Sequence, residues 1–124
     1  MPAMDQPLTG IHILDLTRLL PGPTATVYLA DMAAVLIKID AVYGGVYART
    51  KGHVEVAASQ FPLAINRGRQ CRALDLANGT DRDRFLARTG ATYVLIISFR
   101  PGTMARLKIG WVALKARRSC AWIK

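Results

Sequence analysis

Acidic residues are scarce in this sequence and disappear from its last third. The 124 residues include 8 Asp and Glu against 17 Lys and Arg, which gives a formal net charge of +9. No acid follows Asp83, although basic residues continue as far as Lys124. Such an imbalance indicates either a polyanionic partner or a lost acidic complement. Nucleic-acid binders place these charges on one face with interleaved aromatics or in a known motif. Neither pattern is present, which argues against nucleic acid as the partner.

Cysteines and long apolar runs are also few. Cys71 and Cys120 lie far apart and have no CxxC or Cys/His ligand spacing, so we expect no zinc site, no other metal and no disulfide framework. We expect Cys71 to be buried and inert. Apolar runs such as residues 93–97 are much shorter than a membrane span, and residues 1–6 lack the features of an export signal. The sequence therefore predicts a reduced, cytoplasmic protein without membrane contact.

What remains is typical of one folded domain. Hydrophobic residues make up 52% of the chain and charged residues 20%, which is the balance of a globular protein. A chain of 124 residues is long enough for one hydrophobic core and too short for two domains. We therefore treat residues 1–124 as a single domain.

Short apolar runs predict strands at residues 11–16, 35–39, 73–76 and 93–98, with the start of another at 120–123. The order of strand, helix and strand at the beginning is the unit of a parallel sheet. Ligands on such sheets bind beyond the carboxyl ends of the strands, so the turn at residues 17–24 is the first candidate binding site.

Helical spacing predicts three helices between these strands. The first has Thr24 as its N-cap, Pro23 just outside it, and an apolar face formed by Ala25, Leu29, Met32 and Ala33. The second begins at residues 78–80, has acids in its first turn and a base in its last, and ends before Gly90. A short third helix is expected at residues 111–117.

Four stretches of the chain, in this order, resemble family III CoA-transferases, the group that includes formyl-CoA transferase, carnitine CoA-transferase and α-methylacyl-CoA racemase. Their order and spacing over nearly the whole chain carry the resemblance. They are residues 8–18 (LTGIHILDLTR) followed by 21–23 (PGP) and 29–32 (LADM); 35–40 (VLIKID) followed by 44–45 (GG); 66–70 (NRGRQ) closing on 73–76 (ALDL); and 99–103 (FRPGT) with 106–107 (RL) and Gly110 downstream.

The resemblance covers only the N-terminal part of that family. It implies an α/β fold, a Rossmann-like parallel sheet with flanking helices, which is truncated and incomplete relative to the family. It also implies coenzyme A or an acyl-CoA thioester as substrate and an interlocked homodimer as the assembly. Carried over to matching positions, it implies that CoA is contacted by Leu19, Leu20, Pro21, Ser98, Phe99 and Arg106. A strand-end turn offers backbone N–H groups, an aromatic can stack on adenine, and arginine can pair with phosphate.

The sequence departs from the family at several polar positions. The usual Gly-Ala-Glu before the second strand is replaced by residues 33–36 (AAVL), and the basic residue that often follows this strand is replaced by Ala41 and Val42. The usual Glu-Asn before Phe99 is replaced by Ile97 and Ser98. These changes remove polar groups from the implied CoA region.

The resemblance implies no catalytic residue within this chain. The transferases of the family use an aspartate that forms an acyl anhydride, and the racemases use a histidine and an acid. Both lie beyond the matched region, after Lys124. We therefore expect an N-terminal fragment of a CoA-transferase family III protein, transferring CoA or racemising 2-methylacyl-CoA in the whole enzyme, without catalysis of its own. The alternative is a small basic protein that binds a polyanion or nucleic acid through its acid-free tail.

The remaining chemistry-bearing residues are better explained by structural roles. Asp15 ends a predicted strand, Asp31 lies on a predicted helix, and His12 and His53 have no nearby carboxylate or cysteine pattern. Asp40 could bind a ribose in a dinucleotide fold, but no GxGxxG precedes it, which argues against NAD. Residues 67 and 69, both arginine, are equally consistent with phosphate contact and with solvation.

Overall fold

The structure, a computed structural model, describes residues 6–18, 21–41, 68–116 and 121–123. Strands and helices alternate through most of this length. The described elements are β1 (His12–Leu16), α1 (Pro21–Asp31), β2 (Val35–Asp40), β3 (Arg69–Ala73), α4 (Gly79–Thr89), β4 (Val94–Ile97), α5 (Thr103–Arg106), α6 (Trp111–Lys115) and β5 (Ala121–Ile123).

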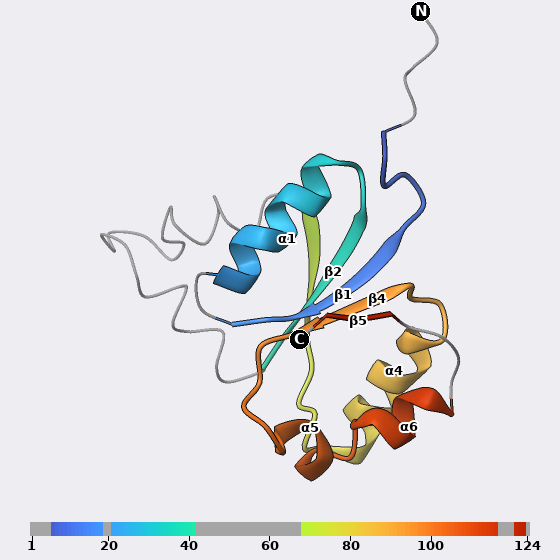
Figure 1. Ribbon diagram of the computed structural model, residues 1–124. Helices are drawn as coiled ribbons and strands as arrows, with labels where there is room; N and C mark the ends of the chain where they lie inside the picture. The colour runs from blue at the N-terminus through green and yellow to red at the C-terminus, as the bar shows by residue number, and fades with distance from the viewer. Residues whose placement is uncertain (1–5, 19–20, 42–67, 117–120, 124) are drawn as a thin grey trace, which may run out of the picture.

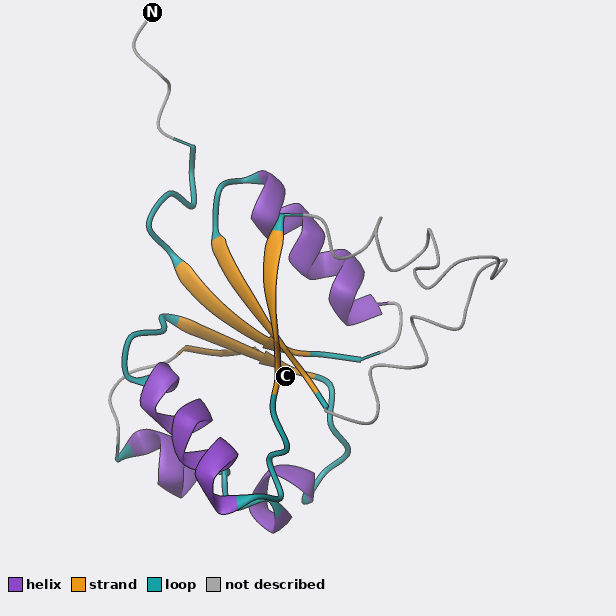
Figure 2. Cartoon of the chain, turned by 180° about the vertical axis from the view of Figure 1, so that it is seen from behind, coloured by secondary structure: helices purple, strands orange, loops and turns teal. Residues whose placement is uncertain are grey.

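The strands form one parallel sheet in the order β3-β2-β1-β4-β5. The order runs outward in both directions from β1, so the carboxyl ends of β1 and β4 meet at a change of direction in the topology. Helix α1 covers one face, and α4, α5 and α6 lie on the other (Figures 1 and 2). The predicted α/β class and the parallel sheet with flanking helices are confirmed.

The larger core lies between the sheet and helices α4, α5 and α6. Along β1 the side chains alternate between the two faces, so Leu14 and Leu16 join the core that contains Phe85, whereas Ile13 joins the smaller core on the α1 side. Phe85, Leu95 and Ile109 of the larger core are completely buried. Both faces of the sheet are therefore covered at β1, which explains why this strand reads as a continuous apolar run.

The predictions for residues 11–16, 35–39, 93–98, 111–117 and 120–123 are confirmed to within about two residues, the scatter expected of element ends. The predicted helix after residues 78–80 is α4. Its N-cap is Asn78, whose Oδ1 accepts hydrogen bonds from the backbone N–H of Thr80 at 2.9 Å and of Asp81 at 3.3 Å. At its end, Gly90 keeps a right-handed φ of −65°, so the left-handed freedom of glycine is not used there.

The prediction for the start of α1 is wrong, and the prediction for its apolar face is right only in part. The helix begins at Pro21, and Pro23 is buried within its first turn, so Thr24 is not the N-cap. A proline has no N–H to lose in the first turn and its φ already suits a helix. The buried side of α1 consists of Pro23, Thr26 and Val27. Of the predicted face, Leu29 is partly buried and packs against the smaller core, whereas Ala25 is exposed and Met32 lies beyond the helix end.

The third strand was predicted too late in the chain. It is Arg69–Ala73 (RQCRA) rather than residues 73–76, and it pairs with β2 from Leu36 opposite Arg69 to Asp40 opposite Ala73. An edge strand is defined by its backbone ladder and does not need an apolar sequence. Cys71 lies on this edge strand and is exposed, whereas we expected it to be buried. Helix α5 was not predicted; it follows the turn at Gly102, whose φ is +85°.

Candidate functional site

A cavity of about 220 Å³ opens at the carboxyl ends of β1, β2 and β4. Its walls come from the ends of these strands, from the segment between β3 and α4, and from α5. The lining residues are Leu16, Arg18, Ile39, Asp40, Ala41, Leu74, Asp75, Leu76, Ala77, Phe99, Thr103, Arg106 and Leu107. This is the edge of a parallel sheet where ligands bind.

Arg18 joins the segment after β1 to the segment after β4. Its backbone N–H donates to Oγ of Ser98 at 2.8 Å. Its guanidinium carbon lies 5.3 Å from the centroid of the Phe99 ring, which is a cation–π distance. Two segments that are 80 positions apart in sequence are thereby held together at the mouth of the cavity.

The structure brings some of the predicted site residues together. Phe99 and Arg106 both line the cavity, and Ser98 lies beside it as the acceptor for Arg18. Pro21 is exposed at the start of α1 and is not among the lining residues. Leu19 and Leu20 lie outside the described residues. The role of these residues in binding remains a prediction.

Two further polar residues of the cavity were not among the predicted CoA contacts. Arg18 lies in the turn at residues 17–24, which was the first candidate site, but it was not singled out there. Asp40 was considered only as a ribose ligand in an NAD site, and it lines this cavity at the end of β2. Asp75 also lines the cavity, but its Oδ1 accepts from the N–H of Ala77 at 3.0 Å and its own N–H donates to Asp81 at 2.9 Å. Asp75 therefore shapes the entry to α4.

A buried ionic network lies directly beneath the turn after β1. Asp15 and Lys38 are register partners on β1 and β2 and are 0% and 5% exposed. The Lys38 ammonium lies 3.9 Å from Oδ2 of Asp15 and donates to the carbonyl of Thr17 at 2.7 Å. Burial of charges is stable only with such pairing and hydrogen bonding. The structural role expected for Asp15 is thus confirmed, and Lys38 is a partner that sequence reasoning did not identify.

The same carboxylate also fixes the turn and the first helix. Oδ1 of Asp15 accepts from both the backbone N–H and the hydroxyl of Thr17, and Oδ2 accepts from the hydroxyl of Thr26 at 2.7 Å. Gly22 lies so close to this turn that a Cβ there would come within 2.2 Å of Cβ of Thr17. The backbone leading to Arg18 is therefore held by a network on one side and by close packing on the other.

Comparison with known proteins identifies the family to which this chain belongs. The model of CoA-transferase family III matches residues 8–119. The chain belongs to CoA-transferase family III. The matched region contains β1, the cavity at its carboxyl end and both segments that Arg18 joins.

Relatives within CoA-transferase family III are similar over most of this chain. The acetyl-CoA:oxalate CoA-transferase of Acetobacter aceti is 36% identical over 108 residues, which is 87% of this chain and 28% of that protein. The succinyl-CoA:mesaconate CoA-transferase of Haloarcula hispanica is 32% identical over 112 residues, again 87% of this chain and 28% of that protein. The chain therefore spans less than a third of the length of these curated relatives.

Solved structures of the family share the fold. The structure of Rv3272 from Mycobacterium tuberculosis matches with a TM-score of 0.84 and 31% identity, over 94% of this chain and 33% of that one. A CAIB/BAIF family protein from Brucella suis matches with a TM-score of 0.86 and 25% identity, over 96% of this chain and 33% of that one.

The described residues contain neither a metal-binding cluster nor a membrane-spanning helix. No group of three or more His, Cys, Asp or Glu side chains there could hold a metal ion. Likewise, none of the helices in the described ranges is long and apolar enough to cross a membrane.

Proposed function

We propose that this chain binds coenzyme A, through its nucleotide part, in the cavity at the carboxyl ends of β1, β2 and β4. The proposal rests on the fact that residues from separate segments of the chain line one cavity. Phe99 and Arg106, which the family resemblance implies as CoA contacts, line one cavity together with Arg18. An aromatic ring and two guanidinium groups are the chemistry that recognises a base and its phosphates.

Each group has a distinct proposed role. Arg106 is exposed in the last turn of α5, where its guanidinium can pair with a phosphate in a bidentate way. Phe99 is half-buried and offers a ring on which adenine can stack. The carboxylate of Asp40, at the end of β2, is placed to accept from a ribose hydroxyl. Arg18 holds the Phe99 ring in position.

The cavity is large enough for only a part of the coenzyme. Its volume of about 220 Å³ is below the roughly 300–1,000 Å³ of pockets that bury a drug-sized ligand. We therefore propose that the nucleotide end is held here and that the pantetheine arm and the thioester lie outside the described residues. The polar groups lost relative to the family predict weak binding.

We further propose that the chain does not catalyse transfer by itself. In the family, the resemblance implies an aspartate that forms an acyl anhydride, and it matches no residue of this chain to that role. The relatives cited above are all named CoA-transferases, which favours transfer of CoA over racemisation in the whole enzyme. The interlocked homodimer and a cytoplasmic location remain part of this proposal.

Calorimetric titration of the purified chain with coenzyme A tests binding. We expect saturable binding that weakens about fivefold in Arg106→Ala, since an exposed ion pair contributes up to roughly 1 kcal/mol. Arg100→Ala is the matched control, because Arg100 is exposed and does not line the cavity. No binding by a folded chain, or equal losses in both variants, would contradict the proposal. Transfer of CoA from succinyl-CoA to mesaconate or oxalate by the chain alone would contradict its catalytic part.

A further inference from the structure

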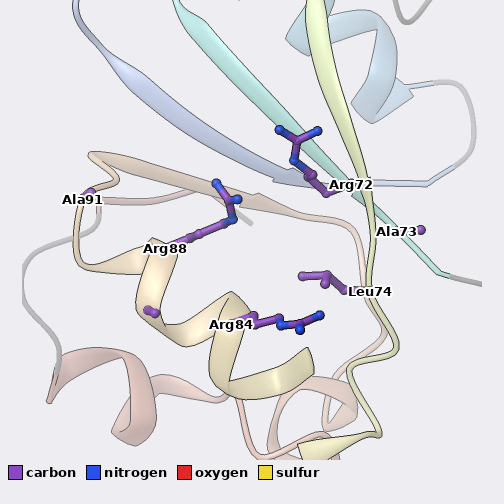
Figure 3. Close-up of a pocket in the computed structure, with 7 residues that line it drawn as sticks. Arg72, Ala73, Leu74, Arg84, Arg88 and Ala91 are labelled. Carbon is purple, nitrogen blue, oxygen red and sulfur yellow. The ribbon is translucent and has the colours of Figure 1, made fainter. Parts of the chain in front are cut away.

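A second cavity lies between the edge strand β3 and helix α4, away from the ends of β1 and β4. Its volume is about 750 Å³, and Figure 3 shows arginine side chains reaching into it from both elements. We call this feature the arginine trough. Its lining residues are Arg72, Ala73, Leu74, Arg84, Ala87, Arg88 and Ala91.

The charge of the arginine trough is poorly compensated. The described residues that line it include three arginines and no acid. Arg84 and Arg88 stand one turn apart on α4, where like charges repel. Arg84 has an ion pair with Asp81 at 3.4 Å, but its side chain is 68% exposed. Arg72 donates to the neighbouring carbonyl of Cys71 at 3.5 Å, which is a long hydrogen bond. The guanidinium groups therefore retain donors for an anion.

The floor of the arginine trough is apolar. Ala87 on α4 and Ala91 just beyond its end leave space beside the arginines, and the opposite wall carries Ala73 and the buried Leu74. None of the described residues that line it is aromatic, so these side chains offer nucleic-acid bases no ring to stack on. A ligand that suits this surface combines carboxylates with a small apolar group.

The spacing of the two arginines on α4 suits an extended peptide. Residues four apart on a helix rise by about 6 Å. Side chains two apart on an extended chain point the same way and are separated by about 6.8 Å. A pair of acids at positions i and i+2 can thus face Arg84 and Arg88, while the residue between them faces the β3 wall with Leu74. A second copy of this chain is a poor occupant, because the only acids two apart in its sequence are Asp81 and Asp83, which lie on helix α4 with Arg82 between them.

We propose that the arginine trough binds an acidic segment of another polypeptide in extended conformation, with two carboxylates two residues apart on Arg84 and Arg88 and an apolar residue between them. The arginines of this site differ from those of the proposed CoA cavity, although Leu74 lines both. Its ligand is recognised by carboxylate–guanidinium pairs from one wall and by apolar contact with the other.

Fluorescence anisotropy with a labelled Ser-Glu-Leu-Glu-Ser peptide tests the proposal. The same peptide with glutamines in place of the glutamates is the ligand control. Arg84→Gln and Arg88→Gln should each weaken binding of the acidic peptide about two- to fivefold, and the double variant about tenfold, as expected for exposed ion pairs. Lys115→Gln is the matched protein control, because it removes one exposed charge outside the trough.

The outcomes separate this site from a general basic surface. Binding that requires the glutamates, falls in the trough variants and is unchanged in Lys115→Gln supports the proposal. Equal binding of the glutamine peptide, or an equal loss in Lys115→Gln, overturns it. A thymidine oligonucleotide that displaces the acidic peptide at lower concentration also overturns it. Urea unfolding of each variant shows that it is folded, so a loss of binding reports on the trough itself.

Discussion

Replacing Lys38 with methionine would leave the Asp15 carboxylate buried without its ammonium partner. Methionine has a similar length and an apolar character, so the volume between β2 and the turn stays filled. The substitution removes the ion pair at 3.9 Å and the hydrogen bond to the carbonyl of Thr17 at 2.7 Å. The carboxylate keeps its hydrogen bonds from Thr17 and Thr26.

The loss of unfolding free energy in Lys38→Met depends on the hydrogen bonds that the Asp15 carboxylate keeps. Removing one partner of a buried pair costs about 3–5 kcal/mol because a charge is left uncompensated. Three hydrogen bonds to the carboxylate persist, so we expect the lower end, about 3 kcal/mol. That is a large share of the roughly 5–15 kcal/mol by which a domain is stable.

Urea unfolding followed by circular dichroism measures this loss. The double variant Asp15→Asn with Lys38→Met is the matched control, because it removes both charges and leaves polar atoms for Thr17 and Thr26. We expect it to be more stable than Lys38→Met alone by about 1 kcal/mol or more, since neighbours in one network are coupled. A single variant within about 1 kcal/mol of the natural chain, or a double variant that loses the sum of both changes, would refute the network.

Two further predictions concern α1 and α4, and both are measured by urea unfolding. Gly22→Ala should destabilise the chain by about 2 kcal/mol through overpacking against Thr17, whereas Gly79→Ala, whose Cβ would meet only the end of the Arg82 side chain at 3.6 Å, should be neutral or slightly stabilising. Equal effects would contradict the close approach at Gly22. Asn78→Ala should cost about 1 kcal/mol by removing the N-cap of α4, and Asn78→Asp should keep the cap; a neutral alanine variant would be the contrary result.

The sequence predicted the fold where apolar content and burial agree. β1, β2 and β4 lie in the middle of the sheet, and their apolar runs are buried on both faces. β3 is an edge strand with a polar sequence, so the search for apolar runs selected the segment after it, where Leu74 is buried in the core. The position of β3 at the edge of the sheet determines where this strand begins and ends, and the local composition alone does not predict it.

The start of α1 could not be placed from local signals because a buried network determines it. Thr26 is buried to donate to Asp15, so a threonine occupies the inner face where an apolar residue was expected. The pairing of Asp15 with Lys38 depends on the register of two parallel strands. The sequence shows one charged residue within each of these two apolar strands, Asp15 and Lys38. Only the register of the strands identifies the two residues as partners.

The candidate site was predictable in part for a similar reason. Phe99 and Arg106 were identified from a motif near the end of β4, and both line the cavity. Arg18 belongs to the first motif, but its contact with Phe99 joins distant segments and no local spacing encodes it.

The basic residues that cluster in the sequence are not all the ones that cluster in the folded structure. The acid-free last third contributes Arg84 and Arg88 to the arginine trough, but Arg72 comes from β3, before that region begins. Lys108 and Lys115, which belong to the tail, line neither described cavity. The parallel pairing of β3 with β2 brings Arg72 opposite α4, so the fold creates a cationic surface that a running count of charges does not contain. A partner of this surface must therefore respond to Arg84 and Arg88 more than to the total number of basic residues in the tail.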